Sequence, residues 1–153
     1  MKRFSKILSL AFVVVLLDRL SKMWVIRHFQ LGESRPLAPF FHLTYLHNTG
    51  TAFGLFQNNN RLLLYFAFTL LIVLVYAARG LCERGGAWAF WGVLLVLGGA
   101  VGNIIDRIHY GRVVDFLDFR VWPVFNLADS AITVGTFCLA VGLLKIERQT
   151  AKS

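Results

Sequence analysis

Acidic residues are scarce in this chain: 8 Asp and Glu stand against 16 Lys and Arg in 153 residues. The cations are scattered between apolar blocks rather than massed on one face, which argues against nucleic-acid binding and favours contact with anionic membrane lipids. Cysteine is scarcer still. The placement of Cys82 beside charged residues and of Cys138 inside an apolar run predicts no disulfide. The 4 His residues lack the i,i+4 spacing of a helical metal site, so we expect no metal.

Apolar residues, in contrast, make up 57% of the chain, far more than in a soluble domain of this length. This composition predicts an integral membrane protein that is mainly α-helical and forms one domain, 1–153. The expected spans are about 7–26, 62–78, 87–105 and 124–144, with polar loops at 27–61 and 106–123. Four spans place both termini on one side, and the basic residues among the first six favour a cytoplasmic N-terminus.

The first span opens like a secretory signal but lacks a small-residue cleavage site, so we expect it to be retained. Its uncharged run, 7–17, rises only about 17 Å as a helix, which is too little for a hydrocarbon core of about 30 Å. The helix must therefore continue through Asp18 to about Ile26. We favour a structural pair of Asp18 with Lys22 at i+4, and a catalytic role of Asp18 stays open as the alternative.

The last span poses the same problem of length. Only fifteen uncharged residues lie between Asp129 and Lys145, too few to cross a bilayer. Extending the helix back to about Val124, just after the helix-starting Pro123, gives the required length. This extension places Asn126 and Asp129 inside the helix, on one face and at membrane depth. The residues from Lys145 onward are expected to form a solvated tail.

The first polar loop contains an alternating stretch, 41–46 (FHLTYL), which predicts a strand and is followed by turn residues at 47–50 (HNTG). A small sheet or hairpin that lies flat on the membrane would bury its apolar side. Asn48, inside the turn, is either an ordinary turn residue or a polar group of a site. Between the second and third spans we expect only a short loop, 80–86.

Four of the eight acids crowd into residues 98–129, beside the last two spans: Asp106, Asp115, Asp118 and Asp129. Charged side chains beside hydrocarbon are costly and are candidates for function. If Asp115 and Asp129 meet at the membrane face, the two carboxylates share one proton, because like charges at close range cannot both ionise. One carboxylate can then take a proton from water while the other donates one, which is the chemistry of an aspartic protease.

Neutral amides could orient such a pair and its substrate without disturbing the charge, and the chain offers three: Asn48, Asn103 and Asn126. Asn103 and Arg107 are spaced i,i+4 at the end of the third span, with Asp106 at i+3 from Asn103, so all three can face one cleft. We expect Arg107 to pair with Asp106, or with another acid, and so to hold the loop that follows.

Each acid also has a structural interpretation when it is taken singly. Asp115 could end a strand, Asp118 could be a solvated loop charge, and Asp129 could pair with a nearby arginine. Two other functions fit the same composition. A proton-coupled transporter or channel subunit would use Asp18 and Asp129 as carriers near the bilayer midplane. A structural assembly factor would leave every carboxylate dispensable.

Five blocks of the sequence, in this order, resemble those of the bacterial lipoprotein signal peptidases, signal peptidase II: Asp18 with Ser21-Lys22, 47–53 (HNTGTAF), 99–107 (GAVGNIIDR), 113–116 (VVDF) and 125–130 (FNLADS). The resemblance spans nearly the whole chain. It implies a membrane aspartic endopeptidase that cleaves diacylglyceryl-modified prolipoproteins just before the lipidated cysteine. It also implies four transmembrane helices, a small extracytoplasmic β-cradle and a cytoplasmic N-terminus in the bacterial inner membrane.

The resemblance further assigns roles to individual residues. It makes Asp115 and Asp129 the catalytic pair and Asp18 a structural acid near the site. The polar supports of the site, or its substrate contacts, would be Asn48, Asn103, Arg107 and Asn126. No cofactor is implied, and the expected partners are prolipoprotein substrates and membrane lipids, with the chain acting as a monomer.

Overall fold

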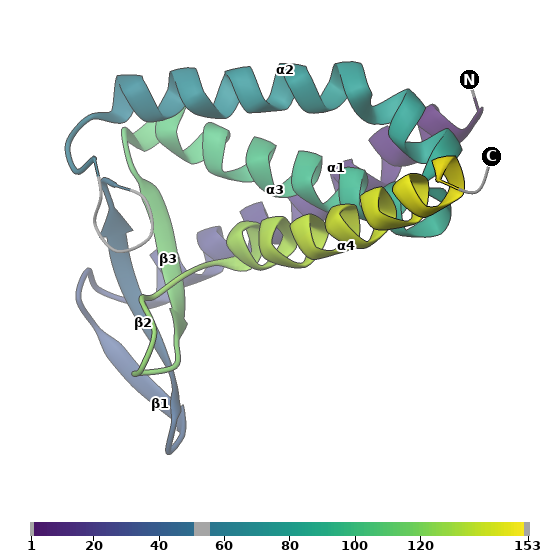
Figure 1. Cartoon of the computed structure of the whole chain (residues 1–153). Coiled ribbons are helices and arrows are strands. Elements are labelled where there is room, and N and C mark those ends of the chain that lie inside the picture. The colour runs from purple at the N-terminus through teal and green to yellow at the C-terminus, as the bar shows by residue number, and fades with distance from the viewer. Residues whose placement is uncertain (1, 51–55, 152–153) are drawn as a thin grey trace.

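The computed structural model describes residues 2–50 and 56–151, and over these residues the chain forms four helices and three strands. In chain order they are α1 (Lys2–His28), β1 (Ser34–Ala38), β2 (Phe41–Asn48), α2 (Asn60–Arg84), α3 (Gly86–Tyr110), β3 (Val113–Asp118) and α4 (Leu127–Thr150). The helices lie side by side, and both termini are at one end of the bundle (Figure 1). The sheet projects from the opposite end.

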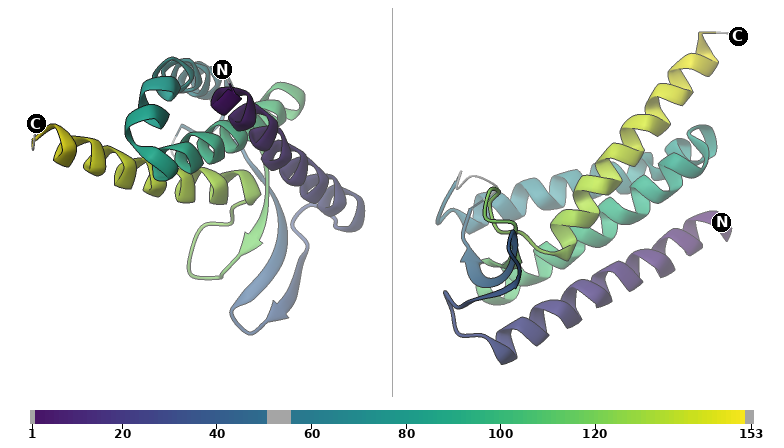
Figure 2. Two further views of the ribbon diagram at one scale, coloured as in Figure 1. Left: turned by 90° about the vertical axis from the view of Figure 1, so that its right-hand side faces the viewer. Right: turned by 90° about the horizontal axis from the view of Figure 1, so that it is seen from below.

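Helix α3 is the centre of the bundle, because it packs against each of α1, α2 and α4. Figure 2 shows α4 crossing α3 near the sheet and leaning away from the other helices toward its C-terminus. Small residues allow the close approach of α3 to α4. A Cβ atom added at Gly99 would lie 2.4 Å from the carbonyl oxygen of Ala128, which is itself fully buried. Such contacts let membrane helices pack backbone against backbone.

The sheet has three antiparallel strands in the order β1-β2-β3. Gly111 ends α3 in the left-handed conformation, with φ 69°, and the chain turns directly into β3. In the register between β2 and β3, Leu46 lies opposite Asp115 and Asn48 opposite Val113. The strand predicted at 41–46 is confirmed, and it continues to Asn48. The turn expected after it runs into residues 51–55, which lie outside the described part of the chain.

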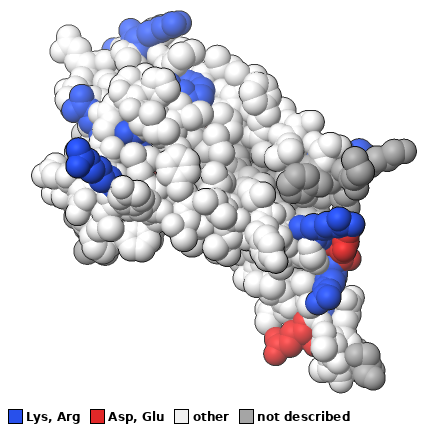
Figure 3. Space-filling view, turned by 90° about the horizontal axis from the view of Figure 1, so that it is seen from above, with Lys and Arg blue, Asp and Glu red and all other residues white. Residues whose placement is uncertain are grey.

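Three of the described helices, α2, α3 and α4, are long and apolar enough to cross a membrane. Helix α1 has the length, but its second half carries Asp18, Arg19 and Lys22. On the face over α2, charged side chains gather at the two ends of the molecule and the broad surface between them is uncharged (Figure 3). Over the described residues the fold is therefore mainly helical, with three helices that could span a membrane and a small antiparallel sheet.

The bounds of the helices differ from expectation at both ends of α4. The helix begins at Leu127 rather than at about Val124, because Asn126 adopts the extended conformation of an N-cap and Phe125 still pairs with Leu117. At the other end, the residues from Lys145 to Thr150, expected as a solvated tail, are mostly exposed but continue the helix.

The expected loop 80–86 is also absent, since α2 continues to Arg84 and α3 starts at Gly86. Gly85 alone separates them. Its N–H donates to the carbonyl of Leu81 and closes α2, and Gly86, with φ 66°, reverses the chain. The two helices are thus joined by a tight turn rather than by a loop of seven residues.

The contact between Gly99 and Ala128 predicts a large effect of one methyl group. The Gly99→Ala variant should lose about 1–3 kcal/mol of stability, because the added Cβ collides with a backbone carbonyl that cannot rotate away. Gly80→Ala in α2 is the matched control, since its Cβ would meet nothing within 4 Å, and it should be neutral or slightly stabilising. Thermal unfolding in detergent measures both; equal melting temperatures would contradict the packing described here.

Candidate active site

A cavity of about 1220 Å³ lies where the sheet meets the helices. Its polar lining includes Asn48 from β2, Asn103 and Arg107 from α3, Asp115 from β3 and Asp129 from α4. The two acids singled out by the sequence therefore open onto the same cavity, although they belong to different elements.

Asp115 lies on β3 with only 2% of its surface exposed. Asn48 donates a hydrogen bond from Nδ2 to its Oδ2 at 3.0 Å, and Asn126 donates from Nδ2 to its Oδ1 at 2.7 Å. Burial, together with the charge of Asp129, raises the pKa of Asp115 to about 7 despite these donors. Asn48 is thus an end-of-strand residue whose side chain points at the acid rather than a plain turn residue.

Asp129 is the third residue of α4, and it forms a capping box with Asn126. The backbone N–H of Asp129 donates to Asn126 Oδ1 at 2.9 Å, and the backbone N–H of Asn126 donates to Asp129 Oδ2 at 3.2 Å. Asn103 donates from Nδ2 to Asp129 Oδ1 at 2.8 Å. Asn126 was expected inside the helix. As its N-cap, it instead uses one end of its amide to hold Asp129 and the other to hold Asp115.

Arg107 lines the cavity from α3, as the i,i+4 spacing with Asn103 predicted. The pairing expected for it is wrong. Its Nη2 donates to the carbonyl of Gly50 at 2.6 Å, while Asp106 is turned away from the cavity toward α1 and binds Arg19 and Lys22. Asp106, three residues after Asn103, therefore lies on a different face of α3 from Arg107 and does not line the cavity.

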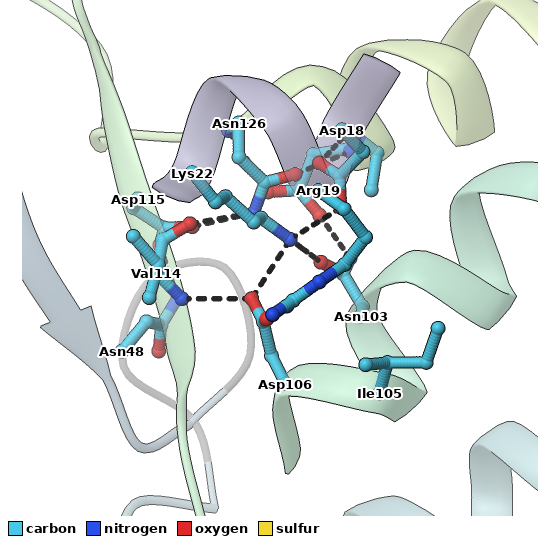
Figure 4. A network of polar contacts seen from close by, with 12 residues as sticks. Asp18, Arg19, Lys22, Asn48, Asn103, Ile105, Asp106, Val114, Asp115 and Asn126 are labelled. Atoms are coloured by element: carbon cyan, nitrogen blue, oxygen red, sulfur yellow. Dashed lines mark hydrogen bonds and ion pairs between the residues drawn. The ribbon is translucent and has the colours of Figure 1, made fainter. Parts of the chain in front are cut away.

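A cluster of buried charges lies behind the cavity, between α1 and α3 (Figure 4). Lys22 Nζ lies 2.8 Å from Asp18 Oδ2 and 2.8 Å from Asp106 Oδ2, and all three residues have no exposed surface. The structural pair predicted for Asp18 and Lys22 is confirmed. Asp18 Oδ1 also accepts a hydrogen bond from the backbone N–H of Ala128 at 3.0 Å, which ties α1 to the first turn of α4.

Sequence reasoning missed the polar contact that joins this cluster to the site. Lys22 donates from Nζ to Asn103 Oδ1 at 3.1 Å, across a separation of 81 residues. Neither the i,i+4 pattern nor the block that contains Lys22 indicates this contact. Among the described residues no group of three or more His, Cys, Asp or Glu is arranged to hold a metal ion.

The arrangement suits acid–base chemistry on a bound molecule. Two acids face one cavity, one of them has a pKa near neutrality, and neutral amides contact both. The rest of the lining is largely apolar and includes Phe119, Trp122 and Ile132. Such a lining lowers the local dielectric constant and so strengthens the interaction between the two acids.

Comparison with known proteins places the chain in a family. The family described as Signal peptidase (SPase) II matches residues 10–145. A lipoprotein signal peptidase of Moorella thermoacetica is 46% identical over 138 residues, which cover 90% of this chain and 91% of that protein. The corresponding protein of Halothermothrix orenii is 41% identical over 140 residues, 89% of this chain and 93% of its own.

Two solved structures share this fold. A bacterial membrane enzyme solved by the in meso method at 2.3 Å superposes with a TM-score of 0.83 at 30% identity, covering 92% of this chain and 88% of that chain. A second bacterial membrane enzyme, solved at 1.9 Å, gives a TM-score of 0.80, again at 30% identity, with 92% and 94% covered. This chain belongs to the signal peptidase II family.

Proposed function

We propose that the chain is a membrane aspartic endopeptidase that removes signal peptides from diacylglyceryl-modified prolipoproteins by cleavage N-terminal to the lipidated cysteine. The observation that carries the proposal is the pair Asp115 and Asp129, which line one cavity and are bridged by the amide of Asn126. Relatives that carry the name lipoprotein signal peptidase support the choice of substrate.

The chemistry follows from two carboxyl groups that share one proton. The ionised carboxylate takes a proton from a water molecule, which attacks the scissile carbonyl carbon while the protonated partner donates to the carbonyl oxygen. Collapse of the tetrahedral intermediate returns a proton to the leaving amide nitrogen. Asn48, Asn103 and Asn126 position the acids through hydrogen bonds. Because these amides are neutral, they add no charge that would force both carboxyl groups to be protonated or both to be ionised.

The surroundings of the cavity suit a lipid-anchored substrate. Apolar side chains of the β3–α4 connection and of α4, Phe119, Trp122, Ile132 and Val134, share the cavity with the acids. A precursor held in the bilayer by acyl chains and its own signal helix presents its scissile bond near the membrane surface. The acids contributed by α4 and β3 lie at the sheet end of the bundle, where that bond would arrive. This arrangement favours a peptidase over a proton carrier, whose acids should lie near the middle of the spans.

We further propose that α1 is a fourth membrane span. Its charges do not oppose insertion, because Asp18 and Lys22 neutralise each other in the interior and Arg19 pairs with Asp106. Four spans place both termini in the cytoplasm of a bacterial cell and the sheet, with the cavity, at the outer face of the inner membrane. The chain then works as a monomer among membrane lipids.

Replacing either acid should abolish catalysis without unfolding the protein. Asp115→Asn and Asp129→Asn should each lower kcat by about 100- to 10,000-fold, the range expected when a positioned acid or base is lost. Cleavage of a diacylglyceryl-modified precursor in detergent, followed by mass spectrometry, measures the rate. Asp118→Asn is the matched control from the same strand, because Asp118 binds Thr44 and Arg120 away from the cavity. Full activity in either dyad variant would remove that residue from the mechanism.

The rate should also depend on pH in a defined direction. The pKa of Asp115 is raised to about 7, so below that pH the pair keeps its proton, and above it both acids become ionised and no proton donor remains. We therefore expect kcat/KM to fall about tenfold per pH unit above about pH 7. Initial rates between about pH 6 and about pH 9 test this, and a rate that stays constant across that range would contradict a dyad with one shared proton.

The side of the membrane can be tested by labelling. In a background with Cys82 and Cys138 replaced by Ala, Leu37→Cys on β1 should react with an impermeant maleimide in intact spheroplasts, because Leu37 is 62% exposed. Gln149→Cys, near the end of α4, should react only after the membrane is permeabilised. Labelling of both positions from the same side would refute the four-span arrangement.

A further inference from the structure

Lys22 has one contact that charge neutralisation does not explain. Its side chain is completely buried between α1 and α3, with the two carboxylates of Asp18 and Asp106 at 2.8 Å (Figure 4). Arg19 pairs with Asp106 as well, so this acid has a second counter-ion. A buried ion pair adds little stability compared with apolar packing of the same volume. The remaining contact of Lys22, to Asn103 Oδ1 at 3.1 Å, leads directly toward the acids of the cavity.

That contact fixes which end of the Asn103 amide faces which neighbour. The oxygen and nitrogen of an asparagine amide occupy nearly the same space, so shape alone does not select one orientation. A lysine ammonium group can only donate hydrogen bonds, and it therefore requires the oxygen of Asn103 on its side. The amide nitrogen must then face Asp129, to which it donates at 2.8 Å.

Asn126, the other neighbour of the Asn103 oxygen, does less to fix the orientation of the Asn103 amide. Asn126 Nδ2 lies 3.3 Å from Asn103 Oδ1, but the same nitrogen donates to Asp115 Oδ1 at 2.7 Å and lies 3.3 Å from the carbonyl of Val114. Its two hydrogens are thus divided among three acceptors. The orientation of Asn126 itself is set independently, since its Oδ1 accepts from the backbone N–H of Asp129.

We propose that Lys22 is a positioning residue, which holds the donor end of Asn103 against Asp129 and so keeps the shared proton of the dyad available to the substrate. The inference rests on the proposed function of Asp115 and Asp129. If Asn103 turned over, its oxygen would face Asp129 and would accept a hydrogen bond from the protonated carboxyl group. The proton would then point at Asn103 instead of at the scissile carbonyl. Lys22 prevents this, although it touches neither the cavity acids nor the substrate.

The test separates positioning from ion pairing by removing Lys22 together with one of its two acid partners, so that the double variant keeps no unpaired buried charge. In an Asp18→Asn background, Lys22→Met removes a cation that has already lost one of its two acid partners, while the other, Asp106, keeps Arg19 as its counter-ion. The amide oxygen at position 18 can still accept from the N–H of Ala128. Relative to Asp18→Asn alone, the double variant should lose about 10- to 100-fold in kcat with KM within about twofold, the cost of a misplaced catalytic group. Cleavage of the lipidated precursor is measured below the melting temperature of both proteins. If the double variant does not fold, Asp18→Asn with Lys22→Leu, which also lacks a donor, takes its place.

A second comparison asks whether Lys22 acts through Asn103. With Asn103→Ala added to both proteins, the loss caused by removing Lys22 should shrink to less than about threefold, measured in single turnovers, because residues that act through one contact are not additive. An unchanged kcat in the double variant, or an equal loss with and without Asn103, would overturn the inference. Asp115→Asn is run in parallel. If that variant cleaves normally, the proposed dyad fails, whatever Lys22 does.

Discussion

One buried amide joins the two halves of the site. Asn126 has no exposed surface, and it accepts from the first turn of α4 with its oxygen while it donates to Asp115 on β3 with its nitrogen. The helix cap and the acid of the sheet are therefore held by the same side chain. Because a buried amide without partners costs free energy, the position of Asn126 requires both contacts, and both acids take their places from it.

The charged residues of α1 that lie behind the cavity are neutralised inside the helical bundle. Asp18, Lys22 and Asp106 are completely buried, and each has a partner of opposite sign within 3 Å. An unpaired charge at this depth would be far more costly than the paired cluster. Through Asp18 and Ala128 the cluster also orders the start of α4. Charge neutralisation in α1 and the position of Asp129 are in this way parts of one network.

The sequence predicted the helices and the strand at 41–46 well, because uncharged runs and alternation are local signals. It predicted the ends of α4 poorly. The argument from bilayer thickness began the helix at about Val124, whereas Asn126 caps it and its first residue is Leu127; at the other end the helix continues past Lys145 to Thr150. Helical spacing placed Asn103 and Arg107 together but failed for Asp106, three residues after Asn103, whose partners lie on α1. Contacts such as Lys22 with Asn103 depend on tertiary packing, which periodicity in one sequence does not contain.

The two acids reach the cavity on different kinds of structure. Asp129 belongs to a helix of the bundle. Asp115 belongs to β3, which pairs with β2 from a distant part of the chain. Neither the inserted helices nor the sheet alone holds both. The two acids come together only when β3, paired with β2, packs against the helices, so a chain whose helices have formed but whose sheet has not would hold the two carboxylates apart.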